Sequence, residues 1–281
     1  MRQLKIIMGI LMGFLPFVSC SAKAPKNPYK TATEIRFWHD NGSVAPQYHQ
    51  KETYVVTPDS ITKTVKVEDG SATASLAITK DMYLAFCDSL AALALDKRKK
   101  SDEGRQKGGP NYGLSVNKDG QSVFSAGHED GRQVVIPQLK DLFGDLYRKA
   151  SYAQYETATE FCHWYNNGSV APQCQMTVSY SVTRDSMSRS LNTMTGVTRD
   201  KFAISKEDFQ EFYACLMQLG LEKPLILPRR MPLPPGSNTV VLSIFKGDAC
   251  LFGSSNSAGT LPASESVISR VFESLFNKYK K

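Results

Sequence analysis

The chain has 281 residues, a formal net charge of +7 and 41% hydrophobic residues. The positive excess is mild and lacks the concentrated basic character of nucleic-acid-binding proteins, so we expect no nucleic-acid partner. The length suits two domains of ordinary size.

The N-terminus has the features of an export leader. Arg2 and Lys5 precede an apolar run from Ile6 to Val18. Such a run is too short for a membrane span and has the length of a signal-peptide core. It ends in the sequence FVSC at Cys20. This ending resembles the lipobox of bacterial lipoproteins, with Phe17 in the place where leucine is usual.

The lipobox resemblance implies a lipid anchor. It predicts that residues 1–19 are a signal peptide, that Cys20 carries palmitate-type acyl chains, and that membrane lipid is therefore a partner. Residues 20–30 are predicted to be a lipidated tether. Ser21, in place of aspartate, implies the outer membrane, with the periplasmic or surface face left open. The mature part resembles the duplicated, uncharacterised domains of envelope lipoproteins.

A tandem duplication organises the mature chain. The stretch from Thr31 to Gln47, TATEIRFWHDNGSVAPQ, returns as TATEFCHWYNNGSVAPQ from Thr157 to Gln173, with 12 of 17 positions identical. The offset between the copies is 126 residues. We therefore predict two homologous domains, residues 31–150 and 151–281.

Each repeat is predicted to be an α+β domain with an antiparallel sheet. Alternating apolar and polar residues predict three to four strands, then a helix, a hairpin and a closing helix. In the first repeat the strands are expected at 31–38, 48–57, 61–67 and 72–78, the first helix at 80–95, the hairpin at 112–124 and the closing helix at 135–149. In the second repeat the same order is expected with three strands, at 157–164, 176–183 and 187–193, followed by a helix at 205–221, a hairpin at 240–252 and a closing helix at 264–278.

The repeated stretch combines a tryptophan with an Asn-Gly turn. Asn-Gly readily adopts positive φ, and a tryptophan is a typical aromatic anchor. We expect a folding element with buried tryptophans; the alternative is a binding loop displayed twice. The residues concerned are Trp38, Asn41 and Gly42 in the first copy and Trp164, Asn167 and Gly168 in the second.

Two cysteines flank the turn in the second copy only. An envelope location is oxidising, so Cys162 and Cys174 are allowed to form a bridge. Pro172 cannot donate a hydrogen bond to a tight ladder, which favours a wide loop over a two-residue turn. In such a loop, centred on Gly168, we expect a cross-strand disulfide.

No familiar catalytic motif occurs, and no cofactor is expected. His39, Asp40 and His49 are the one set with the composition of a metal or acid–base site. Ser60 and Ser186 follow aspartate and precede an aliphatic residue, which resembles an O-glycosylation acceptor of some bacterial envelopes. The alternative for both serines is a hydrogen-bonded turn.

The leading hypothesis is a lipid-anchored cell-envelope protein with a non-catalytic binding or scaffolding role, its partner an envelope protein or a glycan. Basic loops at residues 97–100 and 229–230 suit an acidic glycan or anionic lipid, or are simply solvated. One alternative is a hydrolase with its site near His39, Asp40 and His49. A second alternative is a tandem inhibitor-type module.

Overall fold

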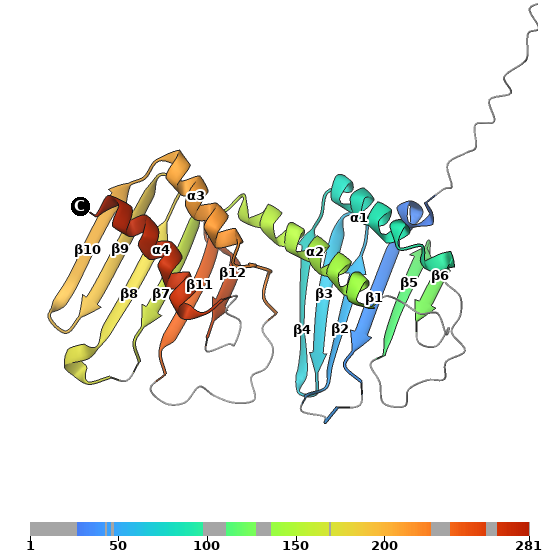
Figure 1. The fold of residues 1–281 in the computed structure, drawn as a ribbon, viewed down its shortest axis with the longest axis horizontal. Coiled ribbons are helices and arrows are strands. Elements are labelled where there is room, and N and C mark those ends of the chain that lie inside the picture. The colour runs from blue at the N-terminus through green and yellow to red at the C-terminus, as the bar shows by residue number, and fades with distance from the viewer. Residues whose placement is uncertain are drawn as a thin grey trace, which may run out of the picture.

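A computed structural model describes residues 27–42, 44–45, 48–97, 111–127, 136–168, 170–225, 237–256 and 263–280. These residues form two similar halves, each with a six-stranded antiparallel sheet and two α-helices (Figure 1). The prediction of two tandem α+β repeats is confirmed. Among the described helices, none is both long and apolar enough to cross a bilayer.

Repeat 1 has the strand order β4-β3-β2-β1-β5-β6. Its elements are η1 (Pro28–Thr31), β1 (Glu34–Asp40), β2 (Gln50–Val56), β3 (Ser60–Val67), β4 (Gly70–Ala77), α1 (Lys80–Ala92), η3 (Leu95–Lys97), β5 (Tyr112–Lys118), β6 (Gln121–Gly127) and α2 (Ile136–Tyr155). Local chemistry explains the boundaries. Thr79 caps α1 by accepting a hydrogen bond from the Met82 amide. Asp119 and Gly120 take φ of 52° and 80°, as a tight β5–β6 hairpin requires.

Repeat 2 has the matching order β10-β9-β8-β7-β11-β12. Its elements are β7 (Glu160–Asn166), η4 (Pro172–Cys174), β8 (Met176–Val182), β9 (Ser186–Thr193), β10 (Gly196–Ala203), α3 (Lys206–Met217), β11 (Thr239–Lys246), β12 (Ala249–Ser255) and α4 (Glu265–Tyr279). Ser205 caps α3 as Thr79 caps α1. The first four strands of each sheet follow one another in the chain, and the hairpin completes the sheet beside β1 or β7.

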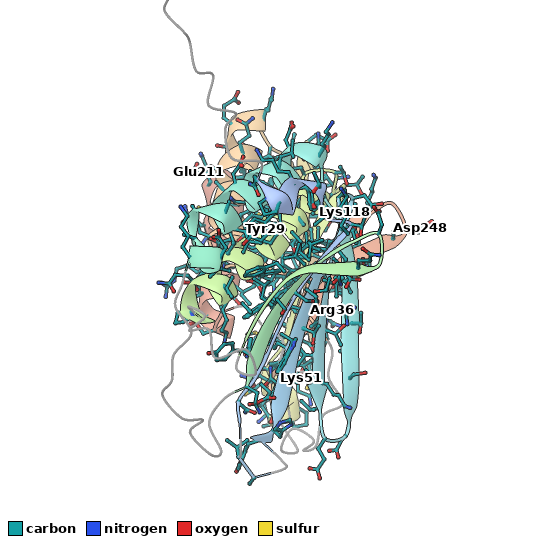
Figure 2. All side chains as sticks on the ribbon, turned by 90° about the vertical axis from the view of Figure 1, so that its right-hand side faces the viewer. Tyr29, Arg36, Lys51, Lys118, Glu211 and Asp248 are labelled. Carbon is teal, nitrogen blue, oxygen red and sulfur yellow. The ribbon has the colours of Figure 1, made fainter. Side chains whose placement is uncertain are left out.

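The described helices lie on one face of each sheet, and none of them lies on the other face, which is called the uncovered face below. In Figure 1 the helices of both repeats lie in front of their strands, and in the turned view of Figure 2 they lie to the left of the strands. Each hydrophobic core lies between the helices and the sheet. Every second residue of a strand contributes its side chain to the core, because alternate residues point to opposite faces of the sheet. The largest buried residues of the two cores are aromatic: Phe37, Phe143, Tyr147, Tyr155, Phe161, Phe252 and Phe272.

The two repeats are joined by one continuous helix. The predicted boundary between residues 150 and 151 falls inside α2, whose last residue, Tyr155, packs in the core of repeat 2. The Tyr147 hydroxyl donates to the carbonyl of Lys223 at 3.0 Å, and the Lys223 amide donates to Ser151 Oγ at 3.1 Å. Glu222 lies beside Arg148, with 3.4 Å between the Arg148 Nε and the carboxylate. The junction between the repeats is therefore helical and packed against the segment around Glu222 and Lys223.

The predicted tether is too long at its C-terminal end. Tyr29 belongs to η1 and is only 4% exposed in the core of repeat 1, where Tyr83 donates its hydroxyl proton to the Tyr29 carbonyl. Tyr29 precedes Tyr155 by 126 residues, so both repeats begin on an equivalent buried tyrosine. Cys20 and the rest of the predicted leader lie outside the described residues.

The prediction of buried tryptophans is wrong. Ile35 and Phe37 point to the helices and are fully buried, so alternation places Trp38 on the uncovered face, where it is half-buried. In repeat 2, Phe161 is buried and Trp164 lies half-buried on the corresponding face. The two tryptophans do occupy equivalent settings, but these settings are outside the cores.

Candidate functional site

The uncovered sheet faces consist largely of hydroxyl side chains. Strand register and alternation place on the face of repeat 1 Thr53, Thr62, Thr64, Thr73, Ser75 and Ser115. They place on the face of repeat 2 Thr177, Ser179, Ser181, Ser188, Ser190 and Ser243. Some hydroxyls pair across strands, such as Thr62 with Ser75 and Thr64 with Thr73, each at 3.0 Å.

Trp38 lies among these hydroxyls in repeat 1. It is opposite Thr53 on β2 and Gly113 on β5. Its indole covers Gly113 so closely that a Cβ added there would lie 2.6 Å from Trp38 Nε1. The Lys51 ammonium lies 4.3 Å from the centroid of the indole, a cation–π distance. The glycine therefore makes room for a ring that lies flat on the sheet.

Trp164 borders a hollow on the same face of repeat 2. Trp164 is opposite Ser179 on β8 and Val241 on β11. The hollow has a volume of about 550 Å³, and its lining includes Trp164, Ser179, Ser181, Ser188, Arg199 and Lys201. An aromatic ring, a row of hydroxyls and two cations thus converge on one surface.

The Asn-Gly turns close wide loops. Asn41 donates from its amide group to the Tyr48 carbonyl at 2.6 Å and accepts from the Gln50 amide at 2.9 Å. Asn167 makes the same two bonds, to the Cys174 carbonyl and from the Met176 amide. Gly42 and Gly168 have φ of 77° and 74°, which only glycine takes readily. These side chains hold their own loops together, which favours the folding role over the binding role.

The predicted disulfide between Cys162 and Cys174 is wrong, because both thiols are free. The wide loop itself was expected, but it is longer than one centred on Gly168. Asn166 pairs with Thr177, so Cys162 lies opposite Ser181. Cys174 lies within the loop, in η4. Since Cys162 is four residues before the end of β7, about 13 Å of strand separates it from the loop.

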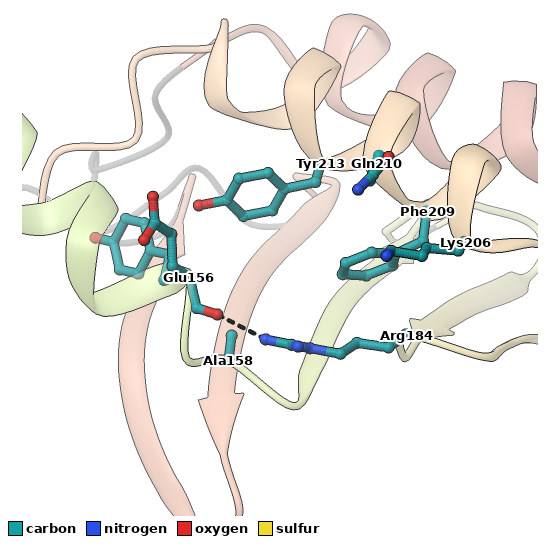
Figure 3. Close-up of a pocket in the computed structure, with 8 residues that line it drawn as sticks. Glu156, Ala158, Arg184, Lys206, Phe209, Gln210 and Tyr213 are labelled. Atoms are coloured by element: carbon teal, nitrogen blue, oxygen red, sulfur yellow. Dashed lines mark hydrogen bonds between the residues drawn. The ribbon is translucent and has the colours of Figure 1, made fainter.

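A second hollow in repeat 2 lies between the end of α2 and α3 (Figure 3). Its volume is about 500 Å³, and Arg184, Phe209 and Tyr213 are among its lining residues. Arg184 donates from Nη2 to the Glu156 carbonyl at 2.7 Å. In repeat 1 the residue equivalent to Phe209 is Tyr83, whose hydroxyl bonds to backbone carbonyls and occupies this corner. The phenylalanine has no such hydroxyl, and Arg184 donates to a different carbonyl from those that Tyr83 reaches, because the equivalents of Tyr29 and Ala32 are Tyr155 and Ala158.

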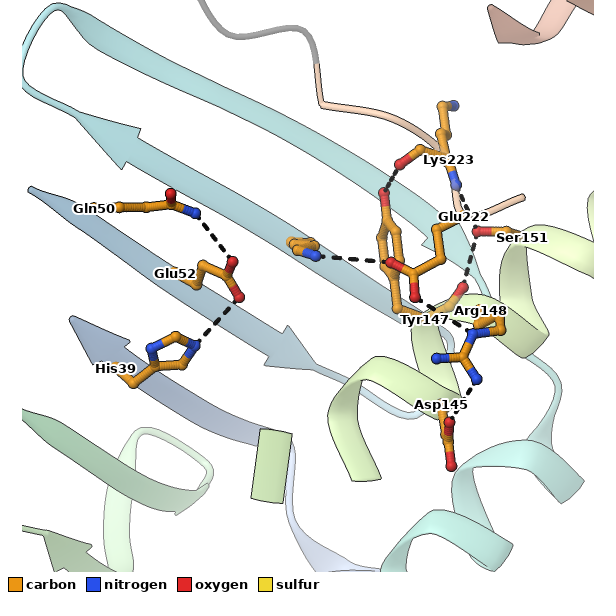
Figure 4. Close-up of polar contacts among 10 residues, drawn as sticks. His39, Gln50, Glu52, Asp145, Tyr147, Arg148, Ser151, Glu222 and Lys223 are labelled. Atoms are coloured by element: carbon orange, nitrogen blue, oxygen red, sulfur yellow. Dashed lines mark hydrogen bonds and ion pairs between the residues drawn. The ribbon is translucent and has the colours of Figure 1, made fainter. Parts of the chain in front are cut away.

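The structure does not bring His39, Asp40 and His49 together. His39 points to the helix side of β1, where its Nε2 lies 3.2 Å from Glu52 (Figure 4). Asp40 points to the other side and accepts hydrogen bonds from the Gly42 and Asn111 amides. His49 is exposed in the loop. Among the described residues, no three His, Cys, Asp or Glu side chains are grouped so as to hold a metal ion.

Glu52 was not among the site residues predicted from the sequence, although its position in the alternating pattern of β2 is a signal for it. Gln50, Glu52 and Tyr54 alternate on the helix side of β2, and Gln50 donates to Glu52 at 3.1 Å. A carboxylate in an otherwise core-facing register indicates a specific partner. The hydrogen bond with His39 lowers the pKa of Glu52, while burial opposes that shift.

Ser60 and Ser186 begin β3 and β9 in identical turns. The Ser60 hydroxyl lies 2.7 Å from Thr57 Oγ1, which donates to Asp59 at 2.6 Å. Thr183, Asp185 and Ser186 repeat this arrangement. The turn interpretation therefore has direct structural support, and both serines are half-buried. Residues 98–100 and 229–230 of the basic loops lie outside the described part of the chain.

Comparisons with known proteins give no family assignment, because no protein-family model and no curated protein matches the chain.

Proposed function

We propose that this is a cell-envelope protein, anchored to the outer membrane through acylated Cys20, that binds a glycan without catalysis. The supporting observation is the occurrence of a half-buried tryptophan at the same place in both repeats, on a face that no described helix covers. A solvent-facing sheet ordinarily carries polar side chains. An indole repeated among them is unusual, because it leaves apolar surface area exposed to water.

The chemistry of the face suits a sugar polymer. Aromatic rings present flat apolar surfaces, and hydroxyls both donate and accept hydrogen bonds, which matches the apolar faces and hydroxyl groups of sugars. Arg199 and Lys201 lie on the face of repeat 2, so acidic sugars are favoured there, whereas Arg36 on the face of repeat 1 is paired with Glu34. Because the helices of both repeats lie on one side, both faces are available to one long chain (Figures 1 and 2).

Binding to purified envelope polysaccharide tests this proposal. We expect Trp38→Ala and Trp164→Ala each to weaken binding about tenfold, equivalent to about 1.4 kcal/mol, and the double variant to weaken it further. The matched control is Tyr48→Ala, which removes an aromatic ring that is 69% exposed on a loop rather than on the sheet face. Unchanged binding by a folded double variant would show that the tryptophans do not contact a glycan.

A further inference from the structure

The repeats differ sharply at one helix-facing corner of the sheet. In repeat 1 this corner contains Glu52 on β2 and Lys63 on β3, between the strands and α2. The residues 126 positions later are Val178 and Arg189 in repeat 2. The exchange replaces a carboxylate with an aliphatic group and retains the cation, while Asp200, which lies opposite Arg189 on the neighbouring strand, stands where repeat 1 has Ala74.

In repeat 1 the cation is balanced from within the chain. The Lys63 ammonium lies 5.3 Å and 5.6 Å from the ring centroids of Tyr54 and Tyr147. It also lies 3.8 Å from the carboxylate of Glu222, which reaches over from repeat 2 (Figure 4). Glu52 is diagonally adjacent to Lys63 on the same face, because Tyr54 pairs with Lys63 and Glu52 with Val65. The hydrogen bond with His39 and, secondarily, the charge of Lys63 lower the pKa of Glu52. In repeat 1 the positive charge of Lys63 is therefore balanced by carboxylates of the chain itself.

In repeat 2 the corresponding cation, Arg189, forms no ion pair with a described carboxylate, although Asp200 of β10 lies opposite it in the strand register. Arg189 has the same aromatic surroundings, with its guanidinium carbon 4.9 Å and 5.9 Å from the ring centroids of Phe276 and Tyr180. Its Nε is buried without a hydrogen-bond partner among the described residues. A buried guanidinium nitrogen without an acceptor is costly, which makes an external anion favourable here.

A cavity of about 740 Å³ opens beside Arg189. Its aliphatic wall comes from Met176, Val178 and Leu191 on β8 and β9. Its charged lining consists of Arg189, with Arg270 and Glu273 from α4, so positive charge exceeds negative by one. Burial lowers the pKa of His163, which also lines the cavity, so that the imidazole adds no charge at neutral pH. The volume lies in the range of small-molecule sites.

We propose that this cavity binds an amphipathic carboxylate, such as a medium-chain fatty acid, and that only repeat 2 has this activity. The carboxylate pairs with the guanidinium of Arg189, which offers the fork of donors that carboxylates accept, and Arg270 adds a second cation at the rim. The aliphatic chain lies against Met176, Val178 and Leu191. Repeat 1 is excluded because its cation already forms an ion pair with Glu222 and has Glu52 diagonally adjacent on the same face.

Displacement of the fluorescent anion 8-anilinonaphthalene-1-sulfonate by decanoate tests the site. Residues 21–281 are suitable, because this chain keeps every described residue and both cores. We expect decanoate to compete at least ten times more strongly than decan-1-ol, which has no charge. Arg189→Met should weaken decanoate about tenfold and leave decan-1-ol unchanged. The matched control, Lys63→Met, removes the equivalent cation of repeat 1 and should leave decanoate binding intact.

A second variant tests the comparison between repeats. Val178→Glu installs the carboxylate that repeat 1 carries as Glu52, so it should pair with Arg189 and reduce decanoate binding at least tenfold. Circular dichroism establishes that each variant is folded, and Arg270→Met replaces Arg189→Met if the latter does not fold. Equal competition by decanoate and decan-1-ol, or full decanoate binding by folded Arg189→Met or Val178→Glu, would overturn the proposal.

Discussion

His163 is the buried titratable residue with the clearest consequence for stability. It is 1% exposed, with Nδ1 3.2 Å from the Val241 carbonyl and Nε2 3.0 Å from Ser269 Oγ. Burial lowers its pKa, against the opposing hydrogen bond with Val241. The unfolded chain therefore binds the proton first as pH falls. The neutral histidine's contribution is fully present above the unfolded pKa of about 6.5 and is lost as pH falls towards the lowered pKa of the folded state.

The resulting prediction concerns His163→Phe, which installs the residue of repeat 1, Phe37. Between pH 7.5 and 5.5, the original chain should lose unfolding free energy by at most about 1.4 kcal/mol per pH unit through this histidine. The variant should lose less. Denaturation followed by Trp164 fluorescence in a Trp38→Phe background reports repeat 2 alone, because the chain has two tryptophans. Identical pH dependence of the two proteins would contradict the assignment.

The exposure and reactivity of the individual cysteine thiols can be tested directly. Cys174, Cys215 and Cys250 are exposed, whereas Cys87 is buried and Cys162 half-buried. Burial also raises the pKa of the Cys87 thiol to about 11 and of Cys162 to about 12, which suppresses the reactive thiolate. A thiol reagent at pH 8 should therefore label three cysteines of the non-reduced native chain from residue 21 quickly, and all five only after denaturation. Protection of Cys174 in the denatured chain would reveal a disulfide.

Asn41 is predicted to stabilise its loop rather than to bind a ligand. Asn41→Ala removes two hydrogen bonds, to the Tyr48 carbonyl and from the Gln50 amide, and should lower the unfolding free energy by about 1 kcal/mol. Asn41→Asp keeps the acceptor and should cost less. Chemical denaturation measures both variants. A neutral Asn41→Ala would leave the loop available for the binding interpretation.

At the scale of elements, α2 has a double role. Its earlier turns contribute Phe143 and Tyr147 to the core of repeat 1, and its last residue, Tyr155, lies in the core of repeat 2. A break in this helix should therefore both destabilise and uncouple the repeats. The same helix side chains contact the segment around Glu222 and Lys223, so the junction is formed by packing as well as by chain connection.

Ala150→Pro tests the continuity of α2. The substitution removes an amide donor from a buried helical position and should cost about 3 kcal/mol or more. Ala150→Gly, the matched control, keeps the donor and should cost about 1 kcal/mol. In single-tryptophan backgrounds, the unfolding transitions seen by Trp38 and Trp164 should separate only in the proline variant. Coincident transitions in that variant would show that other contacts couple the repeats.

At the scale of the whole molecule, the proposed anchor decides where both repeats act. Cys20→Ala should abolish incorporation of labelled palmitate, because the thiol is the acceptor implied by the lipobox resemblance. Cys174→Ala, at an exposed cysteine, is the control and should leave labelling unchanged. Persistent labelling of Cys20→Ala would place the acyl group elsewhere.

The two repeats illustrate how duplication separates structure from specificity. Both keep the sheet order, the capped helices and the closing turns. They differ in single side chains at the corner beneath α2 and α4, where Glu52 and Val178 occupy equivalent strand positions. Such exchanges leave the backbone intact, because an inward strand position accepts any side chain whose polar groups find partners.

The sequence by itself determined the duplication, the α+β class and most elements, because identity at a fixed offset and period-two alternation are local properties. The sequence also contained a signal for buried charges, because Glu52, Lys63 and Arg189 stand at core-facing positions of their strands. Only the tertiary structure decided that Trp38 and Trp164 lie on the uncovered faces. Alternation along a strand separates its two faces but does not show which face the helices pack against. The tertiary structure likewise decided that Cys162 and Cys174 are apart, because loop length sets the register, and that Glu222 reaches Lys63 across the junction.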